Sequence, residues 1–269
     1  MNWSLSFITE NEFYNHVRNT IEQYGQSFEP YNLLRFNENI VDPVKLIFDK
    51  TIYGVTWDEI INKEILRQRD KSNNNSIGYF HQKIFKYFKS CTVPNEGWDV
   101  IYKDGSGISI PDGEKVQTVY VEMKNKFNTM NSSSSSKTYA KMQEQLLADD
   151  KCACFLVEVI AQHSQNVAWR LSINGMRRSH RLIRRVSIDE FYSLVTGQND
   201  AFYQMCMVLP EIISNVIENA SSALLKDDVV INELQETVLE NGGSYPLALY
   251  MLGFKEYRGF NRFTAQYGR

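Results

Sequence analysis

The sequence predicts an α/β protein in which helices pack against a central sheet. An amphipathic helical segment begins near residue 76, and it is followed by segments in which apolar and polar residues alternate, as they do in β-strands. Turn-forming sequences separate these alternating segments, and a second helical segment with further strand patterns follows them. A length of 269 residues is enough for one sizeable core. We therefore expect one compact domain overall, with an accessory segment.

The accessory segment is predicted at residues 1–75, and the core with its C-terminal helices at residues 76–269. Apolar residues recur every three to four positions through most of the first segment, which predicts helices interrupted at Pro30 and Pro43. The polar, asparagine-rich stretch RQRDKSNNNS then separates these helices from the core. Ser76 is expected to cap the first helix of the core.

The core is predicted to contain a helix, three strands, a helix and two strands. The stretches GWDVIYKDG, SGISIPDG and KVQTVYVEMKNK alternate, and the turn signals DGSG and PDGE separate them, which predicts a meander. After a run of serines, SKTYAKMQEQLLADD is predicted to be helical, and CACFLVEVIAQ and VAWRLSI to be strands. The segments IDEFYSLVTG and AFYQMCMVLPEIISNVIENASSALL begin a helical C-terminal region.

The composition limits the possible functions. The net charge of -3 is modest, so nucleic-acid binding would need a local basic patch. The four cysteines show no spacing typical of a zinc site. The sequence has no basic region followed by an apolar block at its start and no long apolar window. We therefore expect a cytoplasmic protein without a membrane partner.

Three charged residues on the predicted strands form the candidate active site. Alternate side chains of a strand share a face, so Glu122 and Lys124 lie on the side opposite Val121 and Met123. Asp99 lies on an earlier predicted strand, on the face opposite its apolar neighbours. If the two strands are adjacent, Asp99 and Glu122 converge.

Two converging carboxylates repel each other and are stable chiefly when a divalent cation lies between them. Lys124 is then placed to assist a metal-bound water or to stabilise the charge on a pentavalent phosphate. The alternative is an ordinary surface ion pair between Glu122 and Lys124. The presence of Asp99 favours a metal-dependent nuclease site.

The sequence around these residues resembles a known superfamily. PNEGWD followed by VEMK, set between an amphipathic helix and a second helix with strands after it, resembles the PD-(D/E)XK nucleases. The run EMKNKFNTMNSSSSSKTYAKMQ and the segments FYSLVTG and FYQMCMVLP resemble a group of type II restriction endonucleases that cut GGNCC or GGWCC sites. The resemblance covers about residues 75–220. It implies a restriction-endonuclease-like fold, which is a mixed central sheet flanked by helices, with an N-terminal helical accessory layer and a helical C-terminal region.

Carried over by position, the resemblance implies that Asp99 and Glu122 bind Mg²⁺ and that Lys124 is the catalytic lysine. The helix before the sheet offers His81 and Gln82 where several members of the superfamily carry a glutamate. Whether one or two metal ions bind is therefore left open.

The implied substrate is double-stranded DNA with a short palindromic site, which is cut in both strands to leave 5′-phosphates. A palindrome read by one polypeptide suggests a homodimer, and a cognate DNA methyltransferase is the expected genetic partner. Two alternatives stay open at this point. One is a repair or structure-specific nuclease of the same fold without a short cognate site, and the other is a non-catalytic DNA-binding protein.

Two stretches are candidates for DNA contacts. Polar residues follow the candidate catalytic strand and lie on the next helix, namely Asn125, Asn128, Asn131, Ser132, Ser133, Ser134, Tyr139 and Gln143. Their amide and hydroxyl groups suit base edges or phosphates, whereas a linker or a helix cap is the structural alternative. The basic stretch GMRRSHRLIRR supplies Arg177, Arg178, His180 and Arg181. Arginine pairs with guanine through two hydrogen bonds, although such a run is also typical of a solvated face.

Overall fold

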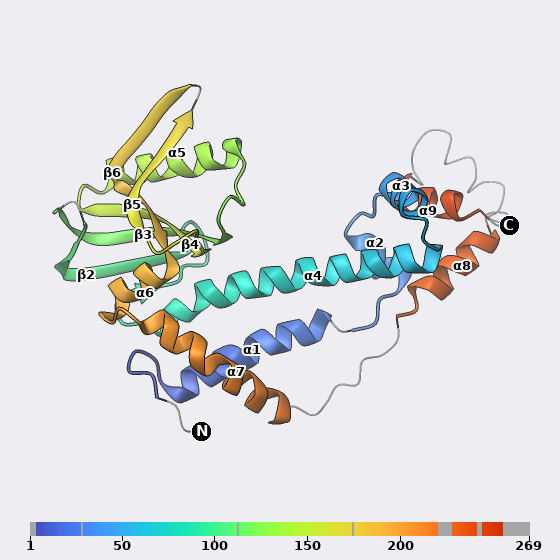
Figure 1. Ribbon diagram of the computed structural model, residues 1–269, viewed down its shortest axis with the longest axis horizontal. Helices are drawn as coiled ribbons and strands as arrows, with labels where there is room; N and C mark the ends of the chain where they lie inside the picture. Colours follow the sequence, from blue (N-terminus) through green and yellow to red (C-terminus); the bar gives the residue numbers. More distant parts are fainter. Residues whose placement is uncertain are drawn as a thin grey trace. The chain divides into compact units, whose positions relative to one another are not determined.

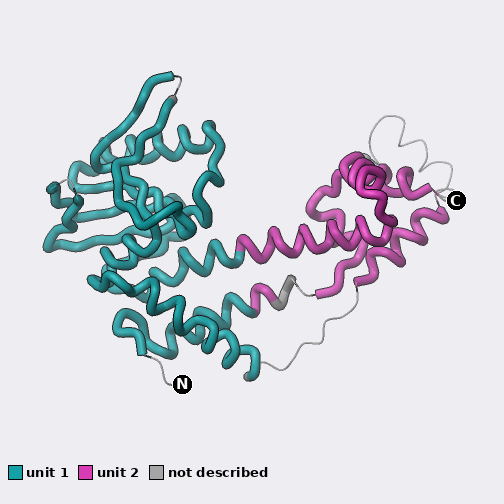
Figure 2. The backbone as a smooth tube through the Cα atoms, in the orientation of Figure 1, with its two compact units in different colours: residues 1–21, 76–221 teal, residues 22–75, 222–269 magenta. Residues whose placement is uncertain are grey.

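The structure of the chain, a computed structural model, describes residues 4–27, 29–111, 113–173, 175–219, 228–240 and 244–254. Contacts divide the chain into two compact units, each built from two separate stretches of sequence (Figure 2). The first unit comprises residues 1–21 and 76–221, and the second comprises residues 22–75 and 222–269. The domain division predicted at residue 75 stays a prediction, because contacts within a chain do not measure independent folding.

A six-stranded mixed sheet forms the centre of the first unit, in the order β1-β2-β3-β4-β6-β5 (Figure 1). The strands β1, β2 and β3 pair antiparallel, β3, β4 and β6 pair parallel, and β5 pairs antiparallel with β6. The predicted α/β class with a mixed central sheet is therefore confirmed. The strands are β1 (Cys91–Thr92), β2 (Val100–Ser109), β3 (Lys115–Lys126), β4 (Cys152–Ile160), β5 (Asn166–Ile173) and β6 (Met176–Ser187).

Parts of the sheet differ from the sequence-based expectation. The expected turn at DGSG is wrong, because β2 runs through it as one strand with a register shift between Lys103 and Ile108. Gly107 adopts a φ of +95° there, which suits the irregular pairing of a bulge. The turn at PDGE is confirmed, with the Gly113 amide donating to the carbonyl of Ile110 at 2.9 Å. β6, which falls in the basic stretch, was not expected as a strand.

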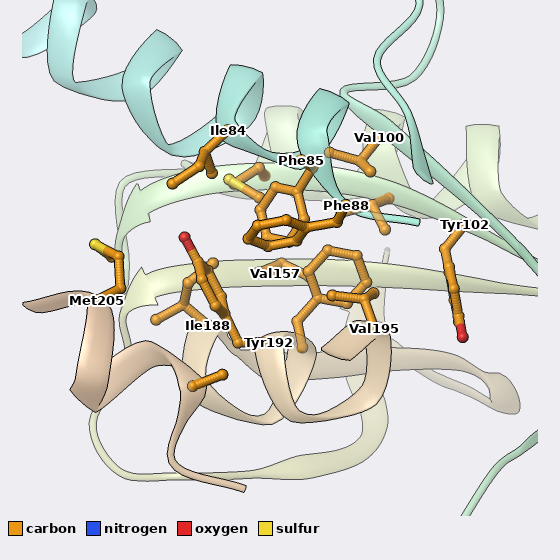
Figure 3. Packing of buried hydrophobic residues seen from close by; sticks show 14 of the residues in the cluster. Ile84, Phe85, Phe88, Val100, Tyr102, Val157, Ile188, Tyr192, Val195 and Met205 are labelled. Carbon is orange, nitrogen blue, oxygen red and sulfur yellow. The ribbon is translucent and has the colours of Figure 1, made fainter. Parts of the chain in front are cut away.

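Helices cover both faces of the sheet. On one face, α5 packs through Tyr139 and Met142 against Leu156 and Ile183 of the strands. The other face is covered by aromatic and aliphatic side chains that include Phe85 and Tyr192 (Figure 3). The helices of this unit are α1 (Glu10–Ser27) as far as Ile21, the end of α4 (Trp57–Lys83), the 3₁₀ helix η1 (Ile84–Tyr87), α5 (Ser132–Ala148), α6 (Ile188–Thr196) and α7 (Ala201–Asn219).

The asparagine-rich stretch is not a break between helices, because α4 continues through it from Trp57 to Lys83. Asn74 and Asn75 lie on the exposed side of this helix, and the Asn74 amide donates to Asp70 at 2.9 Å, one turn earlier. Ser76 is therefore inside the helix rather than at its N-cap. A polar sequence is compatible with a helix whose stability comes from its buried face.

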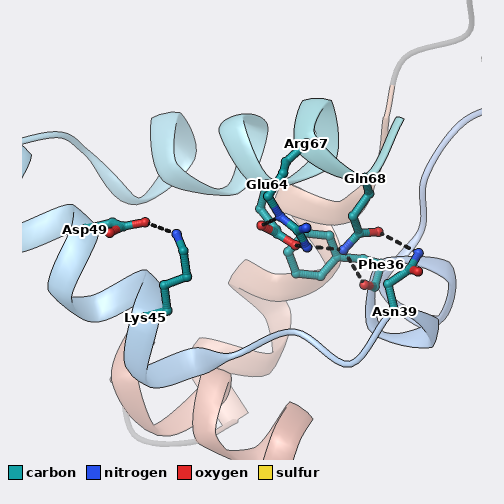
Figure 4. Close-up of polar contacts among 7 residues, drawn as sticks. All are labelled: Phe36, Asn39, Lys45, Asp49, Glu64, Arg67 and Gln68. Atoms are coloured by element: carbon teal, nitrogen blue, oxygen red, sulfur yellow. Dashed lines mark hydrogen bonds and ion pairs between the residues drawn. The ribbon is translucent and has the colours of Figure 1, made fainter. Parts of the chain in front are cut away.

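The second unit is helical in its described residues. It contains α2 (Leu33–Glu38), α3 (Pro43–Tyr53), the first part of α4, α8 (Val230–Glu240) and α9 (Tyr245–Phe254). The predicted interruption at Pro43 is confirmed, since α3 begins there and Asp42 caps its N-terminus. The buried Gln68 amide donates to the carbonyl of Phe36 at 3.0 Å and to Glu64 at 3.1 Å (Figure 4). No described helix is long and apolar enough to cross a lipid bilayer.

Candidate active site

The structure brings Asp99 and Glu122 together at the start of β2 and near the end of β3. Val100 pairs with Val121, which sets Asp99 beside Glu122. The Asp99 amide donates to the carbonyl of Val121 at 3.0 Å, and its carboxylate accepts a hydrogen bond from the Met123 amide at 2.6 Å. Two backbone contacts to β3 therefore fix the position of Asp99, and both carboxylates are half-buried.

Two lysines hold the carboxylate of Glu122, one on each oxygen. Lys124 Nζ donates to Oε1 at 2.8 Å, and Lys141 Nζ donates to Oε2 at 2.9 Å. Lys124 lies two residues along the same strand, as the sequence predicts. Lys141 comes from α5, which packs over this face of the sheet.

The two carboxyl groups have pKa values shifted in opposite directions. Burial raises the pKa of Asp99, and the negative charge of Glu122 adds to this effect. Burial also raises the pKa of Glu122, but the hydrogen bonds and charges of Lys124 and Lys141 outweigh it, so the net pKa of Glu122 is lowered. Glu122 is therefore held ionised, while Asp99 carries an unfavourable charge that a cation would relieve.

This donor set fits a divalent cation. Carboxylate oxygens are the ligands that Mg²⁺ and Ca²⁺ prefer, and Mg²⁺ at phosphate-transfer sites is often held by one or two carboxylates plus substrate phosphates. The described residues contain no group of three or more histidine, cysteine, aspartate or glutamate side chains that could hold a metal. The candidate ligands are therefore the two carboxylates of Asp99 and Glu122.

A cavity of about 170 Å³ opens beside Lys124 on the same face of the sheet. Lys124 pairs in register with Glu158, which is almost fully buried. Arg185 neutralises Glu158 with two hydrogen bonds, of which Nε to Oε2 measures 2.8 Å. Asn128 also lines the cavity and has a φ of +57°, a left-handed conformation that asparagine tolerates.

The serine run forms the first turn of α5 rather than a loop. Asn131 caps this helix, its side chain accepting from the Ser134 amide at 2.8 Å. Ser132, Ser133 and Ser134 are exposed, so their hydroxyl groups are accessible to a ligand. The capping role of Asn131 and a DNA contact by the serines are compatible.

Other predicted contact residues are placed differently. Tyr139 is 1% exposed and packs against Trp169 at 5.4 Å between ring centres, whereas Gln143 is exposed. The two residues were expected to share an accessible face, but Tyr139 belongs to the buried stripe of α5. Asn125 lies against Gly78 of α4, where a Cβ would come within 3.3 Å of its amide, so it faces away from Glu122.

The basic stretch forms the exposed first half of β6. Pairing of β6 with β4 begins at Ile183, so Arg177, Arg178 and His180 extend beyond β4, toward the end of the parallel strands opposite to the carboxylates. Arg181 is ion-paired with Glu114, with Nε to Oε2 at 2.8 Å. The structure therefore does not bring this stretch together with the candidate catalytic residues.

Sequence reasoning missed Lys141. Met142 and Tyr139 mark the buried stripe of α5, and Lys141 flanks that stripe. This flanking position was the available signal, but the sequence does not tell which flank faces Glu122.

The fold and the carboxylate pair with its strand-borne lysine define the class of the protein, the PD-(D/E)XK nucleases with a restriction-endonuclease-like fold. Within this class the chain belongs to the Eco47II restriction endonuclease family, whose family model matches residues 5–218. Enzymes of this class generally use a divalent metal ion.

Two relatives agree with this assignment. The chain is 27% identical to the type II restriction enzyme Sau96I of Staphylococcus aureus over 223 residues, which cover 80% of this chain and 81% of the relative. It is 25% identical to the type II restriction enzyme Eco47II of Escherichia coli over 222 residues, which cover 79% and 88%. The predicted resemblance to type II restriction endonucleases is confirmed.

Proposed function

We propose that the chain is a type II site-specific deoxyribonuclease that requires Mg²⁺ and cleaves both strands of a short palindromic, GGNCC-like site. The observation that carries the proposal is the meeting of Asp99, Glu122 and Lys124 on one face of β2 and β3. Membership of a restriction endonuclease family supports it.

Asp99 and Glu122 are the proposed metal ligands, and bound Mg²⁺ supplies charge neutralisation and lowers the pKa of a coordinated water. Lys124 is proposed to hold its ammonium beside the attacked phosphorus, where it offsets the negative charge that develops on the phosphate. Water adds to phosphorus, the bond to the 3′ oxygen breaks, and that oxygen leaves with a proton as a hydroxyl. The 5′ end keeps the phosphate.

A homodimer related by two-fold symmetry would let one polypeptide read a palindrome and cut each strand once. Ser132, Ser133 and Ser134 are proposed to contact the DNA backbone from the start of α5, where their exposed hydroxyl groups and the positive end of the helix dipole favour a phosphate. Arg177 and Arg178 are proposed contacts farther along the DNA, and a cognate methyltransferase is the proposed genetic partner.

Digestion of a plasmid of known sequence with Mg²⁺ tests the proposal. Discrete fragments whose sequenced ends share one palindrome and carry 5′-phosphates are expected. A smear of fragments with unrelated ends would instead indicate a nuclease without a cognate site. Intact plasmid at every Mg²⁺ concentration would contradict nuclease activity altogether.

A further inference from the structure

Lys141 contacts both segments that carry the candidate metal ligands. Its Nζ donates to Oε2 of Glu122 at 2.9 Å and to the backbone carbonyl of Gly97, two residues before Asp99. The same ammonium lies 4.1 Å from the centre of the Trp98 ring. Lys141 therefore connects the segment before β2 with the end of β3.

Helix α5 holds the segment before β2 at a second point. Trp98 Nε1 donates to Oε1 of Gln145 at 3.2 Å, one helical turn after Lys141. An ammonium with an ion pair, a carbonyl and an aromatic face as partners has little freedom, because moving it breaks all three contacts. Lys141 is consequently fixed relative to the residues around it.

Lys124 is held less firmly. Among the residues that the structure describes, its ammonium donates one hydrogen bond, to Oε1 of Glu122 at 2.8 Å, and its side chain lines the cavity of about 170 Å³. If Lys124 moved away from Glu122, it would lose one charged hydrogen bond and its ammonium would move toward the open cavity. A cation shared by Asp99 and Glu122 needs an oxygen of Glu122 as a ligand. Of the two lysine contacts to this carboxylate, the contact of Lys124 is therefore displaced more readily than that of Lys141.

We propose that Lys141 is a positioning residue that keeps Oε2 of Glu122 in place and ties it to the Gly97–Trp98 segment. Lys124, in contrast, gives up its hydrogen bond to Oε1 when a cation binds. The inference rests on the proposed function, because it assigns different tasks to two lysines of the same metal site. Two other roles for Lys141 would give different results when the lysine is replaced. One is a direct phosphate contact, and the other is a charge that only repels the cation.

Calorimetric titration of the protein with Mn²⁺ in the absence of DNA distinguishes a positioning role of Lys141 from a charge that only repels the cation. Lys141→Met is expected to weaken Mn²⁺ binding by about tenfold or more, the usual effect of losing a residue that orients a metal ligand. Lys141→Arg keeps the charge and the donors and is expected to retain most of the affinity. Lys137→Met is the matched control, since Lys137 is exposed one turn earlier on α5. Unchanged or tighter Mn²⁺ binding by Lys141→Met overturns the inference.

DNA binding in an Asp99→Ala background separates positioning from a phosphate contact. Adding Lys141→Met is expected to leave both the DNA affinity and its dependence on salt unchanged. A lower affinity with a salt slope smaller by about one would instead identify a phosphate contact and overturn the inference. If Lys141→Met does not fold in thermal melts, Lys141→Gln, which keeps an amide donor, replaces it in both experiments.

The two proposals fail in different ways. Wild-type protein that binds Mn²⁺ but leaves plasmid DNA intact contradicts the nuclease, and the Mn²⁺ titration of the variants still decides the role of Lys141. Wild-type protein that cuts DNA, together with a Lys141→Met variant of unchanged Mn²⁺ affinity, contradicts the role of Lys141 alone.

Discussion

The buried His16 and the partly buried His81 make the stability of the first unit depend on pH. Burial lowers the pKa of His16 from 6.5 to about 4, although the carbonyl of Phe80, 2.9 Å from its Nε2, partly opposes this effect. Burial likewise lowers the pKa of His81 from 6.5 to about 4, and the nearby His16 adds to the shift. Both imidazoles are therefore neutral in the folded protein across a range in which they are charged in the unfolded chain.

The sign and size of the effect follow from proton linkage. Below pH 6.5 the unfolded state binds protons that the folded state does not. The contribution of the neutral imidazoles to the unfolding free energy is therefore fully present above pH 6.5 and is lost as the pH drops toward 4. Between about pH 7.5 and about pH 5, each histidine costs about 2 kcal/mol of unfolding free energy. The two histidines together should cost about 4 kcal/mol.

Urea unfolding at these two pH values measures the effect. His16→Gln keeps a side-chain N–H donor but does not titrate, so it should lose about 2 kcal/mol less than the wild type between the two pH values. The exposed His163 supplies a matched control, and His163→Gln should behave like the wild type. A pH dependence of His16→Gln equal to that of the wild type would show that His16 is not kept neutral in the folded protein.

Three further predictions concern the core and the DNA contacts. Tyr192→Phe should leave the unfolding free energy unchanged or raise it by about 1 kcal/mol in urea titrations, because the buried Tyr192 hydroxyl has no hydrogen-bond partner among the described residues; a loss would show that the hydroxyl is satisfied. Leu156→Ala should lower the unfolding free energy by about 2–5 kcal/mol, since Leu156 is fully buried beneath α5, and a smaller loss would argue against this packing. Arg178→Ala should weaken DNA binding and reduce the salt slope by about one in binding titrations, whereas an unchanged slope would exclude a phosphate contact by Arg178.

The candidate site was predictable because its residues obey a simple periodicity. Strand alternation placed Glu122 and Lys124 on one face. The neighbouring position of Asp99 was only a condition, because a turn at DGSG would have set another strand between them; β2 continues through DGSG and pairs directly with β3. Lys141 was not predictable in the same way. The direction of a helical side chain depends on how α5 is rotated on the sheet, and only packing determines that rotation.

The same limit explains the other differences. Tyr139 was expected beside Gln143 on an accessible face, but its ring completes the core with Trp169. β6 begins with a run of exposed polar residues that lacks alternation, and its pairing with β5 makes it a strand. In α4, asparagines on the exposed side do not end a helix whose other side is buried.

Asp99 and Glu122 are the proposed ligands of the metal ion that cleavage requires. Asp99→Asn and Glu122→Gln preserve side-chain size and remove one negative charge each, so they separate catalysis from folding and DNA binding. The most direct measurement compares plasmid cleavage with Mg²⁺ and binding to a short duplex for these variants and the wild type. We expect both variants to lose cleavage and to keep specific binding. Cleavage at the wild-type rate by either variant would contradict it.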